Sequence, residues 1–261
     1  MLENPKNVWV DGCFDLINYG HIILIDLAGS YGENVIVGIL SDEEIFKNKR
    51  LPILQMQERR AILEAIRGVS QVVCDVPYVT SLEWMDRYNC EWCLHGDDHV
   101  LGADGEDPYE HIKKANRFKA LQRTGCISTT DIISRILYPE KREHIISKSY
   151  KNMIRDKFSS YIHRSPTIAN PDQKISYIGG RFDLLHPFLI NYFRKIKGQN
   201  YLIVGIIGDA EIKKKSPQLP LLCSYERGLA MMACKYVDRV IFDAPLKLTS
   251  EFINLHNVRS D

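Results

Sequence analysis

The sequence predicts an α/β fold in two tandem copies, each built around a parallel β-sheet. Short β-branched runs alternate with segments of helical periodicity, which is typical of βαβ units. Four landmarks also recur in one order at a spacing of about 168 positions, which indicates a duplicated domain. The paired landmarks are Gly12–Leu16 with Gly180–Leu184, Val35–Asp42 with Leu202–Asp209, Glu58–Arg59 with Glu226–Arg227, and Asp75–Pro77 with Asp243–Pro245.

The two copies and the segment between them divide the chain into three parts. A first domain is expected over residues 1–138, and a second, truncated and degenerate copy over residues 175–261. Between them, residues 139–174 are rich in Lys, Arg and Ser and are interrupted by Pro139, Pro166 and Pro171. This composition predicts a linker, with a helix expected around Ile145–Phe158.

The first copy contains five strand-like runs that are short and rich in β-branched, aromatic or other apolar residues. They are Val8–Val10, Asn34–Leu40, Gln71–Cys74, Trp92–His95 and Phe118–Leu121. Segments with a helical pattern follow these runs, at Gly20–Gly29, Gln57–Ile66, Leu82–Tyr88, Tyr109–Ala115 and Thr130–Leu137. Ligands of such sheets bind at the carboxyl ends of the strands, so the segments that follow the strands are candidates for one cleft.

The composition excludes several classes of protein. The 261 residues are 45% hydrophobic and 26% charged with a net charge of +1, which indicates neither a disordered chain nor a nucleic-acid-binding polycation. No secretory signal follows Met1, and no apolar run approaches the roughly 20 residues that span a bilayer. Seven scattered cysteines fit reduced thiols in the cytoplasm. Cys90 and Cys93 form a C-x-x-C pair without the second pair of a zinc site, so no structural metal is expected.

The first candidate site follows the first strand, at Asp11–His21. Gly12 at a strand-to-helix turn lets backbone N–H groups approach a phosphate, and the positive end of the next helix adds to the attraction. His21, in the first turn of that helix, is placed to donate a hydrogen bond to a phosphoryl oxygen. A single histidine of this kind is also commonly a satisfied polar residue, so the motif by itself is weak.

A second candidate site, Arg123–Asp131, opens the last helix of the first copy. Arg123 supplies a guanidinium suited to phosphate, and Ser128, Thr129 and Thr130 supply hydroxyls beside the first backbone N–H groups. Ser128 with Asp131 also fits a helix capping box. Capping and anion binding use the same geometry, so the two interpretations are compatible.

Two further polar segments follow strands. Lys47–Arg50 comes after the second strand, where a mobile lysine loop can close over a substrate or simply form a solvated surface. His95–Asp98 ends the fourth strand and places carboxylates where a cationic headgroup or a hydrated Mg²⁺ can bind. A polar turn held by its own side-chain hydrogen bonds is the alternative for this segment.

In combination these motifs resemble the cytidylyltransferases that make CDP-alcohols. The resemblance rests on Asp11–Asp15, the H-x-G-H-like Asn18–His21, His95–Asp98 and the R-T-x-G-x-S-T-T-like Arg123–Thr130. The tandem copies, Pro77–Thr80 and Tyr88–Cys90 are similar to the branch of the family that acts on phosphoethanolamine. The resemblance covers residues 8–137 densely and 175–251 more weakly, and it implies tandem Rossmann-like nucleotidyltransferase domains.

The resemblance implies that phosphoethanolamine attacks the α-phosphorus of CTP, giving CDP-ethanolamine and pyrophosphate for phospholipid synthesis, with Mg²⁺ bound to CTP. It implies catalytic roles for Asn18, His21, Lys49 and Arg123. It implies nucleotide binding by Gly12, Cys13, Phe14, Asp15, Gly20, His95, Asp97, Ser128, Thr129 and Thr130, and headgroup contacts by Tyr78 and Asp98. No nucleic acid and no integral membrane segment is expected, while peripheral membrane association and a homodimer are compatible with the sequence.

Two positions depart from the family pattern. Asn18 stands where the first histidine of H-x-G-H is expected, and Cys126 stands where a glycine is expected. An amide cannot carry the proton or charge of a histidine. A catalytically impaired, nucleotide-binding regulatory protein is therefore an alternative function, and phosphocholine is an alternative substrate.

The second copy departs further from the pattern. It keeps His186 at the position of Asn18 but has Leu189 at the position of His21, and the segment around Arg123 has no counterpart. We therefore expect a scaffold without a site of its own. Its shortened sheet is expected to leave a strand edge that something must cover.

Overall fold

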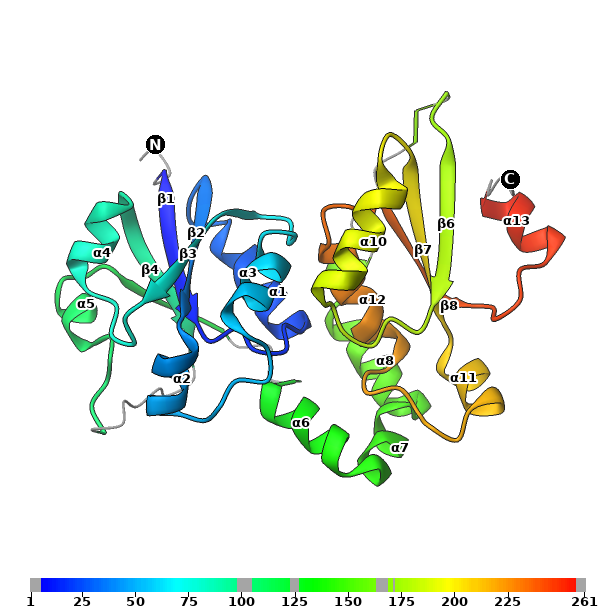
Figure 1. The fold of residues 1–261 in the computed structure, drawn as a ribbon, viewed down its shortest axis with the longest axis horizontal. Helices are drawn as coiled ribbons and strands as arrows, with labels where there is room; N and C mark the ends of the chain where they lie inside the picture. Colours follow the sequence, from blue (N-terminus) through cyan, green and yellow to red (C-terminus); the bar gives the residue numbers. More distant parts are fainter. Residues whose placement is uncertain (1–5, 98–104, 123–126, 163–168, 171, 257–261) are drawn as a thin grey trace. The chain divides into compact units, whose positions relative to one another are not determined.

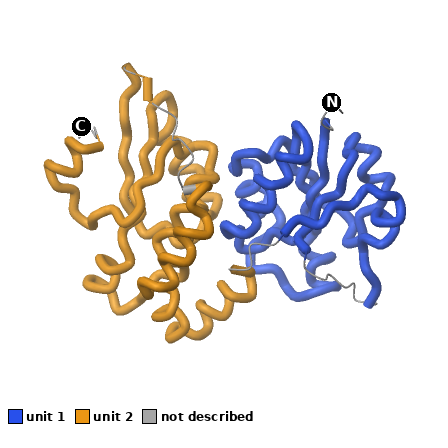
Figure 2. Tube along the Cα trace, turned by 180° about the vertical axis from the view of Figure 1, so that it is seen from behind, with its two compact units in different colours: residues 1–125 blue, residues 126–261 orange. Residues whose placement is uncertain are grey.

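The computed structural model describes residues 6–97, 105–122, 127–162, 169–170 and 172–256. Its internal contacts divide the chain into two compact units, residues 1–125 and residues 126–261 (Figure 2). The division between the units lies after residue 125, within the sequence range of the first copy. The helix that closes the first copy in sequence therefore belongs to the second unit.

The first unit contains a five-stranded parallel sheet (Figure 1). Its strands are β1 (Asn7–Gly12), β2 (Asn34–Leu40), β3 (Val69–Val76), β4 (Cys90–Gly96) and β5 (Phe118–Leu121). Their order across the sheet is β3-β2-β1-β4-β5, and every neighbouring pair is parallel. Together with the parallel sheet of the second unit, this arrangement confirms the expected α/β fold class.

Helices lie on both faces of this sheet. They are α1 (Tyr19–Ala28), α2 (Asp42–Asn48), α3 (Met56–Leu63), α4 (Leu82–Arg87) and α5 (Glu110–Lys114). Figure 1 shows α1 and α3 on one side of the strands and α4 and α5 on the other. One expectation is wrong, because Lys47 lies in helix α2 and not in a loop. Ser41 caps this helix by accepting from Glu44 N at 3.1 Å.

The core of the first unit forms because its central strand is apolar on both faces. Val8, Trp9 and Val10 in β1 are completely buried, as expected for a strand covered by helices on both sides. The indole ring of Trp9 lies across β2, where a Cβ on Gly38 would approach it to 2.5 Å. Glycine at position 38 is therefore required by the packing of β1 on β2.

The second unit begins with helices and ends with a parallel sheet of order β6-β7-β8. The helices before the sheet are α6 (Thr129–Leu137), the 3-10 turn η1 (Pro139–Lys141), α7 (Arg142–Ile145), α8 (Lys148–Lys157) and α9 (Ser159–Ile162). The sheet segment comprises β6 (Ile175–Gly180), α10 (Pro187–Lys197), β7 (Tyr201–Ile207), α11 (Asp209–Lys215), α12 (Ser224–Ala233), β8 (Arg239–Ala244) and α13 (Ser250–His256). The helix expected around 145–158 is present as α8, which begins after its N-cap Ser147.

The second sheet repeats the first three strands of the first sheet. β6, β7 and β8 follow the same order and the same parallel pairing as β1, β2 and β3. Within the described residues β6 pairs only with β7, so the edge that β1 offers to β4 has no strand partner here. The rings of Tyr177 in β6 and Phe252 in α13 are 5.5 Å apart, so α13 packs on β6.

Among the described residues, no helix is both long enough and apolar enough to span a bilayer.

Candidate active site

The carboxyl ends of β1, β2 and β4 lie at one edge of the first sheet, and polar segments follow each of them. β1 ends at Gly12, β2 at Leu40 and β4 at Gly96. β1 pairs with β2 on one side and with β4 on the other. The chain first places β2 and β3 on one side of β1 and then β4 and β5 on the other, so the strand order reverses at β1. Open α/β sheets bind ligands at such a position, so this edge is the candidate active site.

Asn18 begins α1 as its N-cap. Its Oδ1 accepts a hydrogen bond from Gly20 N at 2.9 Å, and its Nδ2 donates to Leu16 O at 3.2 Å. His186 caps α10 at the matching position, where its Nδ1 accepts from Leu189 N at 3.2 Å. Capping is therefore the role that this position has in both copies.

His21 lies in the first turn of α1 and completes a capping box with Asn18. Its Nδ1 accepts a hydrogen bond from the backbone N–H of Asn18 at 3.3 Å. An accepting Nδ1 places the proton of the neutral ring on Nε2. The ring also packs on Phe14, with ring centroids 5.5 Å apart. His21 thus carries an N–H donor at the positive end of a helix, which suits a phosphoryl oxygen.

The turn between β1 and α1 has a rare backbone conformation. Phe14 and Leu16 both have φ of 49°, in the left-handed region that residues with a Cβ seldom adopt. Phe182, which matches Phe14 in the second copy, has φ of 48°. Since the second copy has Leu189 at the position of His21 and still keeps this conformation, the conformation belongs to the repeated fold.

Asp15 organises the segment between α2 and α3. Its carboxylate accepts hydrogen bonds from Ile53 N at 2.9 Å and Leu54 N at 3.0 Å. It also forms a 2.9 Å ion pair with Arg50. Asp183 makes the matching backbone contact in the second copy. These contacts show that Asp15 shapes the protein around the turn.

Arg59 is a framework residue that the motifs did not reveal. It is fully buried, and its guanidinium donates to Cys13 O at 2.7 Å, to Leu40 O at 2.8 Å and to Asp42 Oδ1 at 2.7 Å. It therefore joins the turn after β1 to the end of β2. Arg227 repeats these contacts in the second copy. The recurrence of Glu-Arg in the sequence was the available signal for this role.

Lys49 directly follows α2 and brings positive charge to the same turn. Burial raises the pKa of the Cys13 thiol, and the charges of Lys49, Arg59 and Arg50 act in the opposite direction. Arg50 is paired with Asp15 and Arg59 is surrounded by carbonyl groups. Within the described part of the chain, the Lys49 ammonium has no ion-pair partner, which leaves it as a cation for an anionic ligand.

A buried hydrogen-bond cluster surrounds Asp11 at the end of β1. Its carboxylate accepts from Trp9 Nε1 at 3.1 Å, from the Tyr109 hydroxyl at 2.6 Å and from the Thr80 hydroxyl. Burial raises the pKa of Tyr109 well above its ordinary value, and the charge of Asp11 raises it further. Tyr109 therefore stays protonated and donates. The cluster holds the loop after β3 and the start of α5 against β1.

His95 and Tyr78 lie next to this cluster. The ring of His95 packs on that of Tyr109, with centroids 4.9 Å apart. Tyr78 packs against the hydrophobic cluster that contains Trp9 and Tyr109. The structure thus brings these two expected site residues to one part of the first unit.

The remaining expected residues of the first copy are only partly described. Asp97 follows β4, and its backbone N–H donates to Leu121 O at 2.9 Å. Asp98, Arg123 and Cys126 lie outside the described residues.

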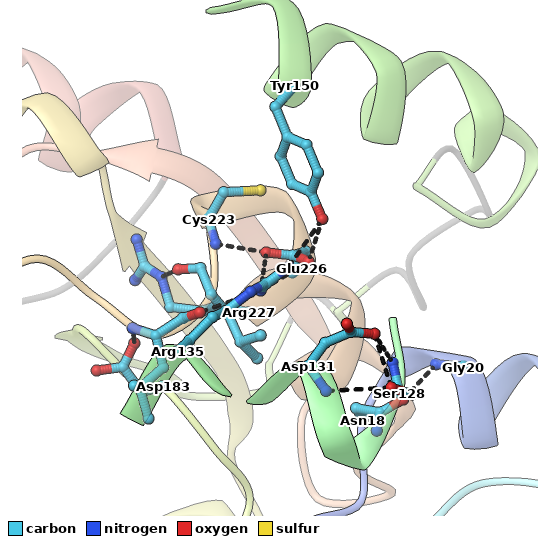
Figure 3. Close-up of polar contacts among 12 residues, drawn as sticks. Asn18, Gly20, Ser128, Asp131, Arg135, Tyr150, Asp183, Cys223, Glu226 and Arg227 are labelled. Carbon is cyan, nitrogen blue, oxygen red and sulfur yellow. Dashed lines mark hydrogen bonds and ion pairs between the residues drawn. The ribbon is translucent and has the colours of Figure 1, made fainter. Parts of the chain in front are cut away.

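Ser128, Thr129 and Thr130 open α6, which belongs to the second unit. Ser128 Oγ accepts from Asp131 N at 3.1 Å, and Asp131 Oδ2 accepts from Ser128 N at 2.8 Å (Figure 3). The capping box expected from the sequence is therefore confirmed. Thr129 and Thr130 occupy the first turn, where backbone N–H groups have no partner within the helix.

Cys90 and Cys93 are unsuited to metal binding and thiol chemistry. Both side chains are buried, and burial raises the pKa of Cys90 to about 12 and that of Cys93 well above its ordinary value. Thiols that stay protonated are poor ligands and poor nucleophiles. Among the described residues, no three or more His, Cys, Asp or Glu side chains gather as a metal site.

In the second unit, a lysine from the expected linker fills the carboxyl end of the sheet. Lys151 in α8 lies 2.9 Å from Asp243 Oδ1 and 3.5 Å from Asp209 Oδ2. Asp243 lies near the end of β8 and Asp209 begins α11 after β7, and they match Asp75 and Asp42 of the first copy. The segment expected to be a linker thus packs on the second copy and neutralises its acidic residues.

Comparison with known proteins supports the family suggested by these motifs. A family model described as Cytidylyltransferase-like matches residues 9–135 and 177–260. Ethanolamine-phosphate cytidylyltransferase of Mus musculus is 32% identical over 293 residues, covering 95% of this chain and 72% of the mouse protein. Its namesake of Dictyostelium discoideum is 34% identical over 277 residues, covering 97% and 77%. Choline-phosphate cytidylyltransferase A of Rattus norvegicus is 35% identical over 137 residues, covering 52% and 37%.

Proposed function

This chain belongs to the cytidylyltransferase-like family, and we propose that it transfers the cytidylyl group of CTP to phosphoethanolamine, forming CDP-ethanolamine and pyrophosphate. The observation that carries the proposal is the similarity to ethanolamine-phosphate cytidylyltransferases across both copies. The similarity to the choline-phosphate enzyme covers only 52% of the chain, which favours the ethanolamine headgroup. The product is a precursor for phosphatidylethanolamine.

In the proposed reaction, a phosphate oxygen of phosphoethanolamine attacks the α-phosphorus of CTP. A new oxygen–phosphorus bond forms while the bond from the α-phosphorus to the bridging oxygen breaks, and its electron pair leaves with pyrophosphate. Both reactants are anions, so catalysis consists of alignment and neutralisation of negative charge. The protein forms no covalent bond with either reactant.

Charge neutralisation is assigned to His21, Lys49 and Arg123. The Nε2–H of His21 at the start of α1 is suited to a triphosphate oxygen, and Lys49 supplies positive charge beside the same turn. Arg123 is assigned the third positive charge from the family pattern alone. The Asn18 amide carries no charge, so it cannot take part in charge neutralisation. It supports the site by capping α1.

Nucleotide binding is assigned first to the turn after β1. A Cβ on Gly12 would lie 3.5 Å from the Phe14 ring, which is an ordinary contact. The packing of the protein itself therefore does not require glycine at position 12. A phosphate that lies close to the backbone at this position would require it, because a Cβ would block the approach. The other residues assigned to the nucleotide are Cys13, Phe14, Asp15, Gly20, His95, Asp97, Ser128, Thr129 and Thr130, and those assigned to the headgroup are Tyr78 and Asp98.

Mg²⁺ is assigned to CTP and not to a protein site. This ion prefers phosphate oxygens and water, with few protein ligands. The carboxylates of Asp11 and Asp15 each accept several hydrogen bonds from the protein itself. The phosphates of CTP are therefore the proposed ligands, and bound Mg²⁺ would neutralise part of their charge.

The test is CTP-dependent formation of CDP-ethanolamine by the purified chain, with phosphocholine as the competing substrate. We expect product from phosphoethanolamine, and a fall of about 10²–10³ in kcat/KM for His21→Ala and for Lys49→Ala. Lys47→Ala removes a lysine from α2 two residues away and is the matched control, which should leave activity unchanged. Product from phosphocholine alone would change the assigned headgroup.

The competing function is a nucleotide-binding protein without turnover. Asn18 motivates it, because loss of one preorganised charged donor typically lowers a rate by about 10²–10³. Calorimetric binding of CTP combined with no product from either phosphoalcohol would support this function and contradict the proposed one.

A further inference from the structure

A buried carboxylate of the first unit ties the segment after α2 to the turn after β1. The Arg50 guanidinium forms a 2.9 Å ion pair with Asp15, whose side chain is 2% exposed. Asp15 also accepts hydrogen bonds from the backbone N–H groups of Ile53 and Leu54 at 2.9 Å and 3.0 Å. One anion therefore holds both ends of residues 50–54.

Lys49 lies directly before this segment, and helix α2 holds its backbone from the other side. The backbone N–H groups of Lys49 and Arg50 donate to Ile45 O at 2.8 Å and 3.1 Å. Ile45 is buried in the hydrophobic cluster that contains Trp9, so this end of α2 is fixed to the core. The Lys49 backbone therefore lies between two attachments, the last turn of α2 and the ion pair of Arg50 with Asp15.

The Lys49 ammonium acts on the turn after β1. Burial raises the pKa of the Cys13 thiol, and the charge of Lys49 is the strongest of the effects that lower it. A charge acts in this way only over a short distance, so the ammonium lies beside the turn. Lys49 is exposed to solvent, and a long exposed side chain has many rotamers. Its placement beside Cys13 therefore depends on how firmly its backbone is held.

The second copy shows which of these contacts belong to the repeated fold. Asp183 matches Asp15, and it accepts a hydrogen bond from the backbone N–H of Leu221 at 2.9 Å, as Asp15 does from Ile53. The contact between this carboxylate and the backbone after the helix is therefore common to both copies. It serves the fold and does not depend on a lysine.

The ion pair, by contrast, accompanies the lysine. Lys49 and Arg50 precede a Leu-Pro pair in the first copy, whereas Pro217 and Gln218 precede the matching Leu-Pro pair in the second. The carboxylate of the second copy pairs with Arg181 of its own turn at 3.5 Å. The cross-link from the carboxylate to the residue after the lysine is thus found in the copy that has the lysine.

We infer that Arg50 is a positioning residue for Lys49, and that its ion pair with Asp15 holds the Lys49 ammonium beside the turn after β1 for the triphosphate of CTP. The inference rests on the proposed function, in which Lys49 neutralises charge on CTP. Arg50 acts through the backbone and not on the nucleotide, because its guanidinium is engaged by Asp15 and by Leu51 O at 2.8 Å.

The first test replaces Arg50 by glutamine and by lysine. Arg50→Gln should lower kcat/KM for CTP about tenfold, less than Lys49→Ala does, because a misplaced cation keeps part of its attraction. Arg50→Lys retains the charge and should recover most of the lost rate. Gln218 at the matching position shows that glutamine is compatible with such a segment. Arg60→Gln removes the same charge from an exposed ion pair in α3 and is the matched control, with kcat/KM unchanged.

A double-mutant cycle shows whether Arg50 acts through Lys49. Arg50→Gln should lower kcat/KM about tenfold in the unaltered chain but less than about twofold in the Lys49→Ala chain. A general loss of stability would lower the rate equally in both chains. Equal losses in the two chains, or no loss in the unaltered chain, overturn the inference.

A second cycle tests the ion pair itself. Asp15→Asn keeps the size of the side chain and removes its charge, so Arg50→Gln should have little further effect in the Asp15→Asn chain. If Arg50 binds CTP directly, Asp15→Asn leaves its charge free for the nucleotide. Arg50→Gln then lowers kcat/KM for CTP in the Asp15→Asn chain by as much as in the unaltered chain or more, which overturns the inference.

Calorimetry of CTP binding distinguishes failure of this inference from failure of the proposed function. Weaker CTP binding in Arg50→Gln that is absent in the Lys49→Ala background supports the positioning role even if the unaltered chain forms no CDP-ethanolamine, which contradicts the proposed function alone. Losses of CTP affinity that add in the two backgrounds, in a chain that forms CDP-ethanolamine, contradict the positioning role alone.

Discussion

Asn18 and His186 occupy matching positions, and each caps the helix that follows the first strand of its copy. The amide oxygen and the imidazole nitrogen accept the same kind of backbone hydrogen bond. The departure from H-x-G-H therefore keeps the helix start while it removes a group that can carry charge. Two residue types satisfy one structural requirement and differ in the chemistry they offer.

Substitution of Asn18 separates these two roles. Asn18→Ala should lower the free energy of unfolding by about 1 kcal/mol, because the Gly20 N–H loses its acceptor. Asn18→His should lower it less, since His186 shows that an imidazole can cap here, and it should raise kcat. Urea unfolding and the CDP-ethanolamine assay measure the two effects. An Asn18→Ala protein as stable as the unaltered chain would contradict the capping role.

Tyr109 predicts a dependence of stability on alkaline pH. Burial and Asp11 raise its pKa in the folded state, so the unfolded chain releases the proton first as the pH rises past about 10. The stability contributed by this hydroxyl is complete below that pH and is lost above it. Tyr109→Phe should therefore show a smaller loss of unfolding free energy between pH 9 and 11, as reference values imply. Tyr138→Phe, at an exposed position, is the control and should follow the unaltered chain.

At the scale of helices and strands, the periodicity of the sequence predicted the elements well. All five expected strands of the first copy are present, and Asn34–Leu40 has the expected ends. The central strands β1 and β2 are mostly apolar and buried, as expected for parallel strands covered on both faces. The error occurs at a polar segment, where the Ser41 side chain begins helix α2 and places Lys47 in a helix. Local capping decides such boundaries, and apolar spacing does not reveal it.

Two glycines at neighbouring strands should respond in opposite ways to alanine. Gly38→Ala in β2 should cost about 1–3 kcal/mol of stability, because its Cβ would meet the Trp9 ring at 2.5 Å. Gly12→Ala at the end of β1 should change stability by less than about 0.5 kcal/mol but raise the KM for CTP. Thermal unfolding and the KM for CTP measure the two effects. If Gly12→Ala alters neither quantity, the nucleotide does not approach this backbone.

At the scale of the whole molecule, duplication is visible in hydrogen bonds as well as in sequence. Arg59 and Arg227 bind matching carbonyl groups and matching carboxylates, Asp42 and Asp209. The repeated framework thus persists in a copy that has Leu189 at the position of His21. Framework residues are retained because their removal leaves buried acceptors without donors in either copy.

Removal of these arginines should affect the two units unequally. The Asp209 side chain is 2% exposed and that of Asp42 is 33% exposed. Arg227→Met should therefore lower the free energy of unfolding by about 3–5 kcal/mol, because it removes a partner from a buried carboxylate. Arg59→Met should lower it by less. Hydrogen exchange in β2 and β7 measures the stability of each unit. Arg60→Met, in an exposed ion pair, is the control and should cost less than about 1 kcal/mol. A larger loss of unfolding free energy for Arg59→Met than for Arg227→Met would show that the exposure of the paired carboxylate does not determine the effect.

Linear order and chemical type were sufficient to establish the duplication, the parallel sheets and the motifs of the candidate site. These properties depend on the spacing of residues and on the secondary-structure preference of each residue type, and both can be read from the sequence. Folding alone revealed that Asp15 and Arg59 shape the turn after β1, that Asp11 gathers Trp9, Thr80 and Tyr109, and that α6 belongs to the second unit. Those relations join residues far apart along the chain, and they exist only because burial forces each polar group to find a partner in three dimensions.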